Sequence, residues 1–188
     1  MASIRTFIAI NAPDSIRDKM LLVQDQLRTL DADVRWESSD KFHATIKFLG
    51  NTEESKLPAI LSSIESALSA FRSFEITFQT IGSFPNSKRP RVVWIGCEND
   101  DGTLLRIKTS LDEGLVQYGF EIEKRDFHPH ITLGRVRSEK RLDHLTPMLE
   151  KLTFEPQKTR LDKIFLMCSV LRPAGAEYSV LNVFQLQR

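Results

Sequence analysis

Two kinds of hydrophobic pattern alternate along the chain. Short apolar or strictly alternating segments predict strands, and longer segments with apolar residues at three- and four-residue steps predict amphipathic helices. We expect helices at about 14–30, 53–70, 103–117 and 139–151. We expect strands at 4–10, 34–36, 43–49, 74–81, 92–97, 120–122, 130–136, 153–158, 163–171 and 178–187. This mixture of elements predicts an α+β fold.

The elements recur in the same order at an offset of 87 residues, which superimposes Phe7 on Trp94 and His43 on His130. No linker rich in Gly, Ser or Pro separates the two halves, so we expect one bilobal domain over 1–188. Its internal repeat covers about 4–83 and 91–170, and a C-terminal strand follows at 176–187. Each of the two pseudo-symmetric lobes should be a mostly antiparallel sheet with helices packed on its outer side, and a catalytic cleft should lie between them.

The motif His-x-Thr-x occurs once in each half, as His43–Thr45 and as His130–Thr132. Side chains two positions apart on a strand point to the same face, so each motif presents an imidazole beside a hydroxyl. If a pseudo-twofold axis relates the halves, the two pairs can meet across one cleft. This arrangement suits displacement at phosphorus. One imidazole can take a proton and the other can donate one, while the hydroxyls bind the non-bridging oxygens.

Other interpretations of the histidines remain open. A lone His-x-Thr is more often structural than catalytic, and the occurrence of two in register with the repeat is what favours catalysis. His43, His128 and His130 could instead be three zinc ligands. His144 lies in a predicted helix among charged residues and reads as a surface residue. The acid–base scheme needs no metal and no cofactor.

The chain resembles the RNA 2',3'-cyclic phosphodiesterases, formerly called 2'-5' RNA ligases, of the 2H phosphoesterase superfamily. The resemblance extends over nearly the whole chain, and its motifs occur in order at 5–10, 36, 42–50, 84–85, 89–96, 127–135 and 169–178. It implies hydrolysis of a terminal 2',3'-cyclic phosphate to a 2'-phosphate, and it implies joining or splitting of 2'-5' linkages. By the same resemblance His43 is the proton donor to O3' and His130 the proton acceptor from water, beside the motif residues Thr45 and Thr132. The spacing alone does not assign acid and base.

Three further residues are candidates for substrate binding. The resemblance favours Arg135 as a phosphate contact, although strict alternation puts both Arg135 and Phe48 on the face away from the histidines. A bulge at Gly50 or Gly134 would change that. Phe48 either stacks on a base or fills the core, and we favour the core. Lys47 shares the histidine face by alternation and either binds substrate or is a solvated lysine. A loop with Lys88, Arg89 and Arg91 could also guide an RNA backbone.

The net charge of +1 excludes a polycationic coat protein, so any contact with nucleic acid requires a local patch. Cys97 and Cys168 show no metal-ligand spacing, which favours a reducing cytoplasmic location over a disulfide scaffold. No apolar segment approaches the roughly 18 residues of a membrane span. We expect a monomer that acts on an RNA or oligonucleotide with a 2',3'-cyclic phosphate end. The alternatives are a non-catalytic RNA-binding module and a phosphodiesterase for small cyclic nucleotides.

Overall fold

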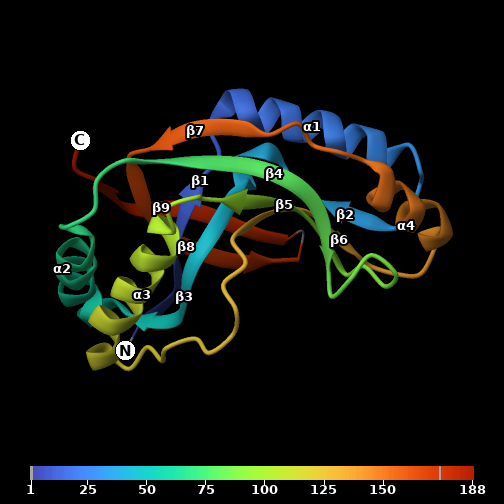
Figure 1. The fold of residues 1–188 in the computed structure, drawn as a ribbon. Helices are drawn as coiled ribbons and strands as arrows, with labels where there is room; N and C mark the ends of the chain where they lie inside the picture. Colours follow the sequence, from blue (N-terminus) through green and yellow to red (C-terminus); the bar gives the residue numbers. More distant parts are fainter. Residues whose placement is uncertain (1, 174) are drawn as a thin grey trace.

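The computed structural model describes residues 2–173 and 175–188 as one curled sheet with helices against it (Figure 1). Every pairing between its strands is antiparallel, and the predicted α+β fold is confirmed. The strands are β1 (Ser3–Asn11), β2 (Val34–Trp36), β3 (His43–Glu53), β4 (Phe74–Phe84), β5 (Val92–Glu98), β6 (His130–Val136), β7 (Gln157–Leu161), β8 (Lys163–Arg172) and β9 (Gly175–Gln185). The helices are α1 (Asp14–Arg28), α2 (Leu57–Leu68), α3 (Thr103–Leu115) and α4 (Leu142–Lys151), with short 3-10 turns η1 (Ser39–Lys41), η2 (Glu54–Lys56) and η3 (Val116–Tyr118).

One predicted strand is wrong, and another is displaced. Residues 120–122 lie in the loop before β6, where the Glu121 carbonyl accepts a hydrogen bond from the Lys47 ammonium at 2.8 Å. The Lys47 side chain therefore provides a hydrogen bond to this backbone that a neighbouring strand would otherwise provide. The strand expected at 153–158 is β7, which begins only at Gln157, where pairing with β4 becomes possible.

The order of strands in the sheet is β7-β4-β5-β6-β3-β1-β8-β9, and β2 pairs with β6. The last strand of each half of the repeat pairs with the first strand of the other half: β4 pairs with β5, and β8 pairs with β1. Each lobe of the sheet therefore contains strands from both halves. This exchange differs from the simplest expectation, in which each half would form its own lobe.

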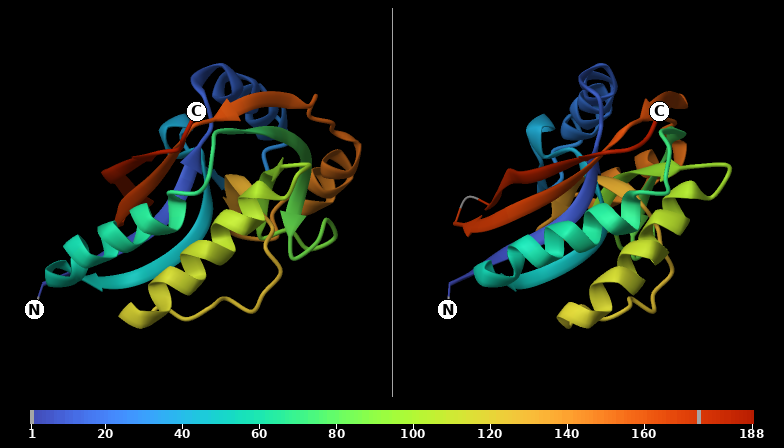
Figure 2. Two further views of the ribbon diagram at one scale, coloured as in Figure 1. Left: turned by 60° about the vertical axis from the view of Figure 1, so that its left-hand side comes forward. Right: turned by 90° about the vertical axis from the view of Figure 1, so that its left-hand side faces the viewer.

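The helices also associate across the two halves of the repeat, and they cover one face of the sheet. Helices α2 and α3 lie side by side, joined by hydrogen bonds from Ser63 to the Gly114 carbonyl and from Ser110 to the Ala67 carbonyl (Figure 2). Along β1, Ile8 and Ile10 belong to the main core on the helical side. Phe7 and Ala9 form a smaller apolar cluster on the opposite face, which leaves that face accessible for a site. No helix within the described ranges has both the length and the apolar character that crossing a bilayer would require.

Two bulges at equivalent positions of the repeat decide which side chains reach that open face. Along β1 and β3, Ile8 pairs with Lys47 and Ala9 with Thr45, so Ile46 is the extra residue. Along β5 and β6, Trp94 pairs with Thr132 and Val93 with Gly134, so Leu133 is extra. A single extra residue reverses the alternation of side chains beyond it. The reversal occurs just after each His-x-Thr motif, and β3 has a second irregularity in which Leu49 is extra between Phe48 and Gly50.

The bulge in β6 is stabilised by a buried glutamine of α1. The Leu133 carbonyl accepts a 2.8 Å hydrogen bond from the Glu37 amide and a 2.7 Å bond from Gln24 Nε2. Gln24 Nε2 also donates to the Glu37 carbonyl at 2.7 Å. The carbonyl of the extra residue at the bulge thus accepts two hydrogen bonds. The same side chain ties α1 to β6 and to the segment that follows β2.

The reversal of alternation places Lys47 on the helical side, so the prediction that it shares the histidine face is wrong. Its side chain is only 3% exposed and forms an ion pair with Asp112 of α3, which is equally buried. Lys108 pairs with the other oxygen of Asp112 at 2.6 Å. One carboxylate therefore neutralises two buried ammonium groups, and Lys47 also holds the loop before β6 through Glu121.

We expect Asp112→Asn to destabilise the protein by about 3–5 kcal/mol, because it leaves two ammonium groups buried without a counter-charge. Chemical denaturation monitored by circular dichroism measures this change. The control is Glu113→Gln, which removes an exposed carboxylate from the neighbouring position of the same helix. Its effect should stay within about 0.5 kcal/mol. Equal stability of the two variants would contradict the role assigned to the buried pair.

Candidate active site

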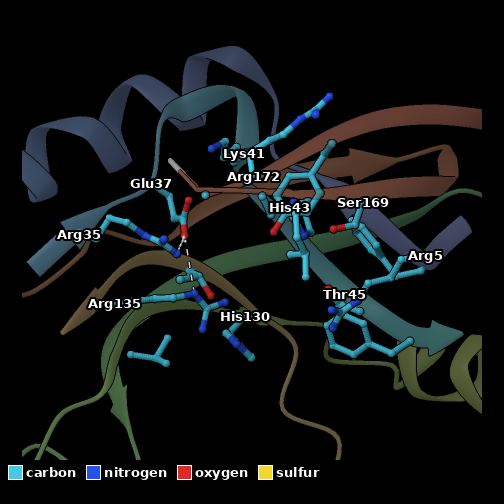
Figure 3. Close-up of a pocket in the computed structure, with 18 residues that line it drawn as sticks. Arg5, Arg35, Glu37, Lys41, His43, Thr45, His130, Arg135, Ser169 and Arg172 are labelled. Carbon is cyan, nitrogen blue, oxygen red and sulfur yellow. Dashed lines mark ion pairs between the residues drawn. The ribbon is translucent and has the colours of Figure 1, made fainter. Parts of the chain in front are cut away.

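A cavity of about 710 Å³ lies on the face of the sheet opposite the helices (Figure 3). The two motifs meet in it: His43 and Thr45 enter from β3, and His130 and Thr132 enter from β6. The pairing of β3 with β6 through Ala44 and Ile131 brings them together. Because these strands run antiparallel, the two motifs enter the cavity from opposite directions. A pseudo-twofold axis between the two halves predicts this arrangement.

Each imidazole is anchored through the backbone two residues before it. His130 Nδ1 donates a hydrogen bond to the His128 carbonyl at 2.7 Å. His43 makes the equivalent hydrogen bond to the backbone of Lys41. In His130 this bond fixes the proton on Nδ1 and leaves Nε2 with a free lone pair in the neutral ring.

Aromatic side chains pack against both imidazoles and partly shield them from solvent. The His43 ring lies 4.9 Å from the Phe7 ring and 4.8 Å from the Tyr178 ring, centroid to centroid. The His130 ring lies 4.9 Å from the Phe84 ring. Loss of solvation, and then the charge of Arg135, lower the pKa of His43 to about 4 against the favourable bond to Lys41. Burial likewise lowers the pKa of His130, so both rings are neutral at pH 7 before a substrate binds.

The predicted binding residue Arg135 lines the cavity, because the bulge at Leu133 turns it toward the histidines. Its Nε lies 3.6 Å from Oε1 of Glu37, and an Arg35 nitrogen lies 3.9 Å from the same oxygen. Glu37 therefore holds Arg135 from one edge. A planar guanidinium held in this way keeps its remaining N–H groups for a phosphate.

Phe48 also lines the cavity, because the bulge at Ile46 turns it to the open face. Its side chain is 62% exposed, so the preference for a core position was wrong. Its ring centroid lies 6.0 Å from that of Phe7, and the two form an apolar wall next to His43. Lys47, by contrast, does not belong to the lining and remains buried beneath the sheet.

The lining concentrates positive charge that the whole chain lacks. Five basic side chains and one carboxylate, Glu37, face the cavity, although the net charge of the chain is only +1. The basic residues are Arg5, Arg35, Lys41, Arg135 and Arg172. The lining within the described ranges includes none of the basic loop residues Lys88, Arg89 and Arg91. The local patch required by the sequence is therefore the cavity itself.

Within residues 2–173 and 175–188, no three His, Cys, Asp or Glu side chains are grouped so that they could hold a metal ion. The three-histidine zinc site considered from the sequence is therefore not formed by this fold. The polar groups that line the cavity are imidazoles, hydroxyls, basic side chains and the Glu37 carboxylate. These groups can bind an anion and move protons to and from it.

Sequence reasoning gave no role to several residues of this site: Arg5, Phe7, Arg35, Glu37, Lys41, Ser169, Arg172 and Tyr178. They come from β1, β2, η1, β8 and β9, or from the segments next to these elements, and only the fold brings them to the motifs. Two patterns could have pointed to some of them. Arg35 and Glu37 are two apart next to a predicted strand, and Arg5 and Phe7 share one face of another.

Comparison with known proteins agrees with this geometry. Residues 25–169 match the family model of the 2'-5' RNA ligase superfamily. The RNA 2',3'-cyclic phosphodiesterase of Methanothermobacter thermautotrophicus is 36% identical over 184 residues, covering 97% of this chain and 99% of the relative. The RNA 2',3'-cyclic phosphodiesterase of Thermotoga maritima is 32% identical over 183 residues, covering 97% and 96%.

Solved structures share the fold over its full extent. The crystal structure of Escherichia coli LigT complexed with 3'-AMP superimposes with a TM-score of 0.79 at 25% identity and covers 100% of both chains. That of TT0787 from Thermus thermophilus gives a TM-score of 0.81 at 24% identity and covers 98% of each. The resemblance seen in the sequence is confirmed, and the chain belongs to the 2'-5' RNA ligase superfamily.

Proposed function

We propose that this protein hydrolyses the 2',3'-cyclic phosphate end of RNA to a 2'-phosphate. The observation that carries this proposal is the pair of anchored imidazoles, His43 and His130, that face one cationic cavity. The names of the relatives from Methanothermobacter and Thermotoga support the same substrate class. Two proton-transfer groups on opposite sides of one anion are what an in-line displacement at phosphorus needs.

In the proposed step, water attacks phosphorus opposite the ribose O3'. His130 Nε2 takes the proton of the attacking water while the new P–O bond forms. The bond from phosphorus to O3' breaks, and His43 donates a proton to the departing oxygen. The products are a 2'-phosphomonoester and a free 3'-hydroxyl. His130 then carries the proton that His43 has lost, and exchange with solvent resets the pair.

The lining of the cavity supports this assignment of acid and base. The repeat superimposes Phe48 on Arg135 and Arg5 on Val92. The two sides of the cavity therefore carry different side chains at equivalent positions of the backbone. Phe48, Phe7 and Tyr178 make the His43 side aromatic, which suits a ribose and its base. The leaving O3' belongs to that ribose, so the acid should lie on the same side.

The negative charge that develops on the phosphoryl oxygens needs hydrogen-bond donors that are fixed in advance. The hydroxyls of Thr45 and Thr132 lie two positions beyond their histidines on the same strands and face the same cavity. Arg135, held by Glu37, adds a charged donor on the His130 side. A sugar hydroxyl in place of water would give a 2'-5' linkage by the same steps.

We expect His43→Ala and His130→Ala each to lower kcat/KM by roughly 10²–10⁴-fold on an oligonucleotide 2',3'-cyclic phosphate. Activity of the wild-type protein should persist in EDTA and yield only the 2'-phosphate, as read by chromatography against both product isomers. The matched control is His144→Ala, because His144 is an exposed histidine of α4 outside the cavity. Full activity of both cavity variants, or a 3'-phosphate product, would refute the mechanism. Binding of RNA without turnover would favour the RNA-binding module.

The lowered pKa values of both histidines predict a kcat/KM maximum on the acid side of pH 6.5. The productive form carries one proton on the pair, on His43 and not on His130, and the low pKa of His43 makes this form a minor one in the free enzyme. Above the pKa of His130 both rings are neutral, and below the pKa of His43, about 4, both are protonated. A bound phosphate anion favours the imidazolium, so the alkaline limb of kcat should lie at higher pH. Initial rates from pH 4 to 9 test this, and an alkaline limb of kcat/KM above 6.5 would contradict it.

Phe48 should contribute to binding the base and not to the chemical step. We expect Phe48→Ala to weaken kcat/KM for a nucleoside 2',3'-cyclic phosphate by about 1–2 kcal/mol, in the range of one stacked base. Ribose 2',3'-cyclic phosphate, which has no base, should show no such loss. Since the ring is 62% exposed, thermal unfolding of the variant should be close to wild type. An equal loss on both substrates would remove base stacking as its role.

A further inference from the structure

Three basic side chains of the lining lie on the side of the cavity away from Thr45 (Figure 3). Arg35 comes from β2, Lys41 from η1 and Arg172 from the end of β8. Two of them converge on a single point next to the backbone of β9. A Cβ atom placed on Gly175 would lie 3.6 Å from Arg35 Nη1 and 3.9 Å from Lys41 Nζ.

The backbone of Gly175 keeps this point free of a side chain. Its φ of 133° is a conformation that residues with a Cβ rarely adopt. Gly175 pairs with Arg172 across the β8–β9 hairpin, so the end of the hairpin borders the space between Arg35 and Lys41. At its own position, Gly175 therefore leaves the space beside the Arg35 and Lys41 nitrogens without a side chain.

The carboxylates nearby leave this positive charge incompletely neutralised. Glu37 is 3.9 Å from Arg35 and is shared with Arg135. Arg172 pairs with Glu177 at 3.2 Å. Lys41 forms no salt bridge with any residue in the described ranges. Two cations that converge without a shared carboxylate repel each other, and a bound anion would relieve that repulsion.

Lys41 borders the His43 side of the phosphoryl site, and Arg35 reaches it from β2, where it pairs with Arg135. Lys41 is two residues before His43, and its backbone is hydrogen-bonded to that imidazole. In the orientation proposed above, the ribose of the terminal nucleotide lies on this side. An RNA chain continues from that ribose through its 5' oxygen, so the next charged group along the chain is a phosphodiester.

We infer that Arg35, Lys41 and Arg172 form a second phosphate subsite that binds the phosphodiester on the 5' side of the terminal nucleotide. The inference rests on the proposed function and makes it more specific. The preferred substrate is the end of an oligonucleotide and not a mononucleoside cyclic phosphate. Arg135 and the threonines bind the phosphate that reacts, and the second subsite binds the one that does not.

The test measures equilibrium binding of product-like monoesters, which need no turnover. A dinucleotide with a terminal 2'-phosphate should bind roughly tenfold more tightly than the nucleoside 2'-phosphate, as one charged contact predicts. Its affinity should fall more steeply with salt, with a slope of log K against log salt larger by about 0.7. A dinucleotide with a neutral methylphosphonate linkage keeps both bases and should lose the gain and the extra slope.

Lys41→Gln should bring the affinity and the salt slope of the dinucleotide close to those of the nucleoside 2'-phosphate. The substitution leaves no carboxylate without its counter-charge, since Lys41 has no acidic partner among the described residues. Lys88→Gln is the control of equal charge, placed in the exposed loop outside the cavity. If Lys41→Gln or the methylphosphonate dinucleotide still shows the tighter binding, the proposed subsite is wrong. Loss of the gain with Lys88→Gln would overturn it as well.

Failure of the proposed function has a different signature. A protein that does not hydrolyse cyclic phosphates can still show or lack the extra affinity for the dinucleotide, because the binding assay uses stable monoesters. Where hydrolysis is observed, the ratio of kcat/KM between the dinucleotide and mononucleoside cyclic phosphates should fall toward one in Lys41→Gln. It should stay at its wild-type value in Lys88→Gln.

Discussion

The antiparallel pairing of β3 with β6 through Ala44 and Ile131 is the constraint on which the site depends. It joins the two lobes of the sheet and sets two strands of opposite direction side by side. Each strand carries its own His-x-Thr motif, so the imidazoles approach one cavity from two sides. A parallel pair would place both motifs in the same orientation, and one histidine could not oppose the other across a phosphate.

The two sides of the cavity have the same backbone but different side chains. Equivalent bulges at Ile46 and Leu133 turn equivalent positions, Phe48 and Arg135, toward the histidines. One side thereby gains an aromatic ring and the other a guanidinium. A symmetric frame can thus bind an asymmetric substrate, with ribose and base on one side and phosphoryl oxygens and water on the other.

Local periodicity predicts the four helices and most of the strands, and the recurrence of His-x-Thr predicts the four motif residues. The sequence also shows the 87-residue repeat. It does not predict which face Lys47 and Phe48 occupy, since a bulge is decided by pairing with another strand and no glycine marks it. Gln24, which stabilises the bulge at Leu133, lies 109 positions away in the chain. Arg35 and Lys41 reach the site only through the fold, so local patterns carry no sign of their convergence.

Charge and solvation act together at this site. Burial keeps both imidazoles neutral before a substrate binds, so their protonation adds little to the repulsion among the five basic side chains of the lining. A phosphate anion between them reverses the balance, because it offsets those charges and stabilises an imidazolium. The proton needed by the leaving oxygen therefore arrives together with the substrate. Protonation is coupled to binding, and His43, which donates this proton in the proposed step, lies against the aromatic wall that receives the ribose.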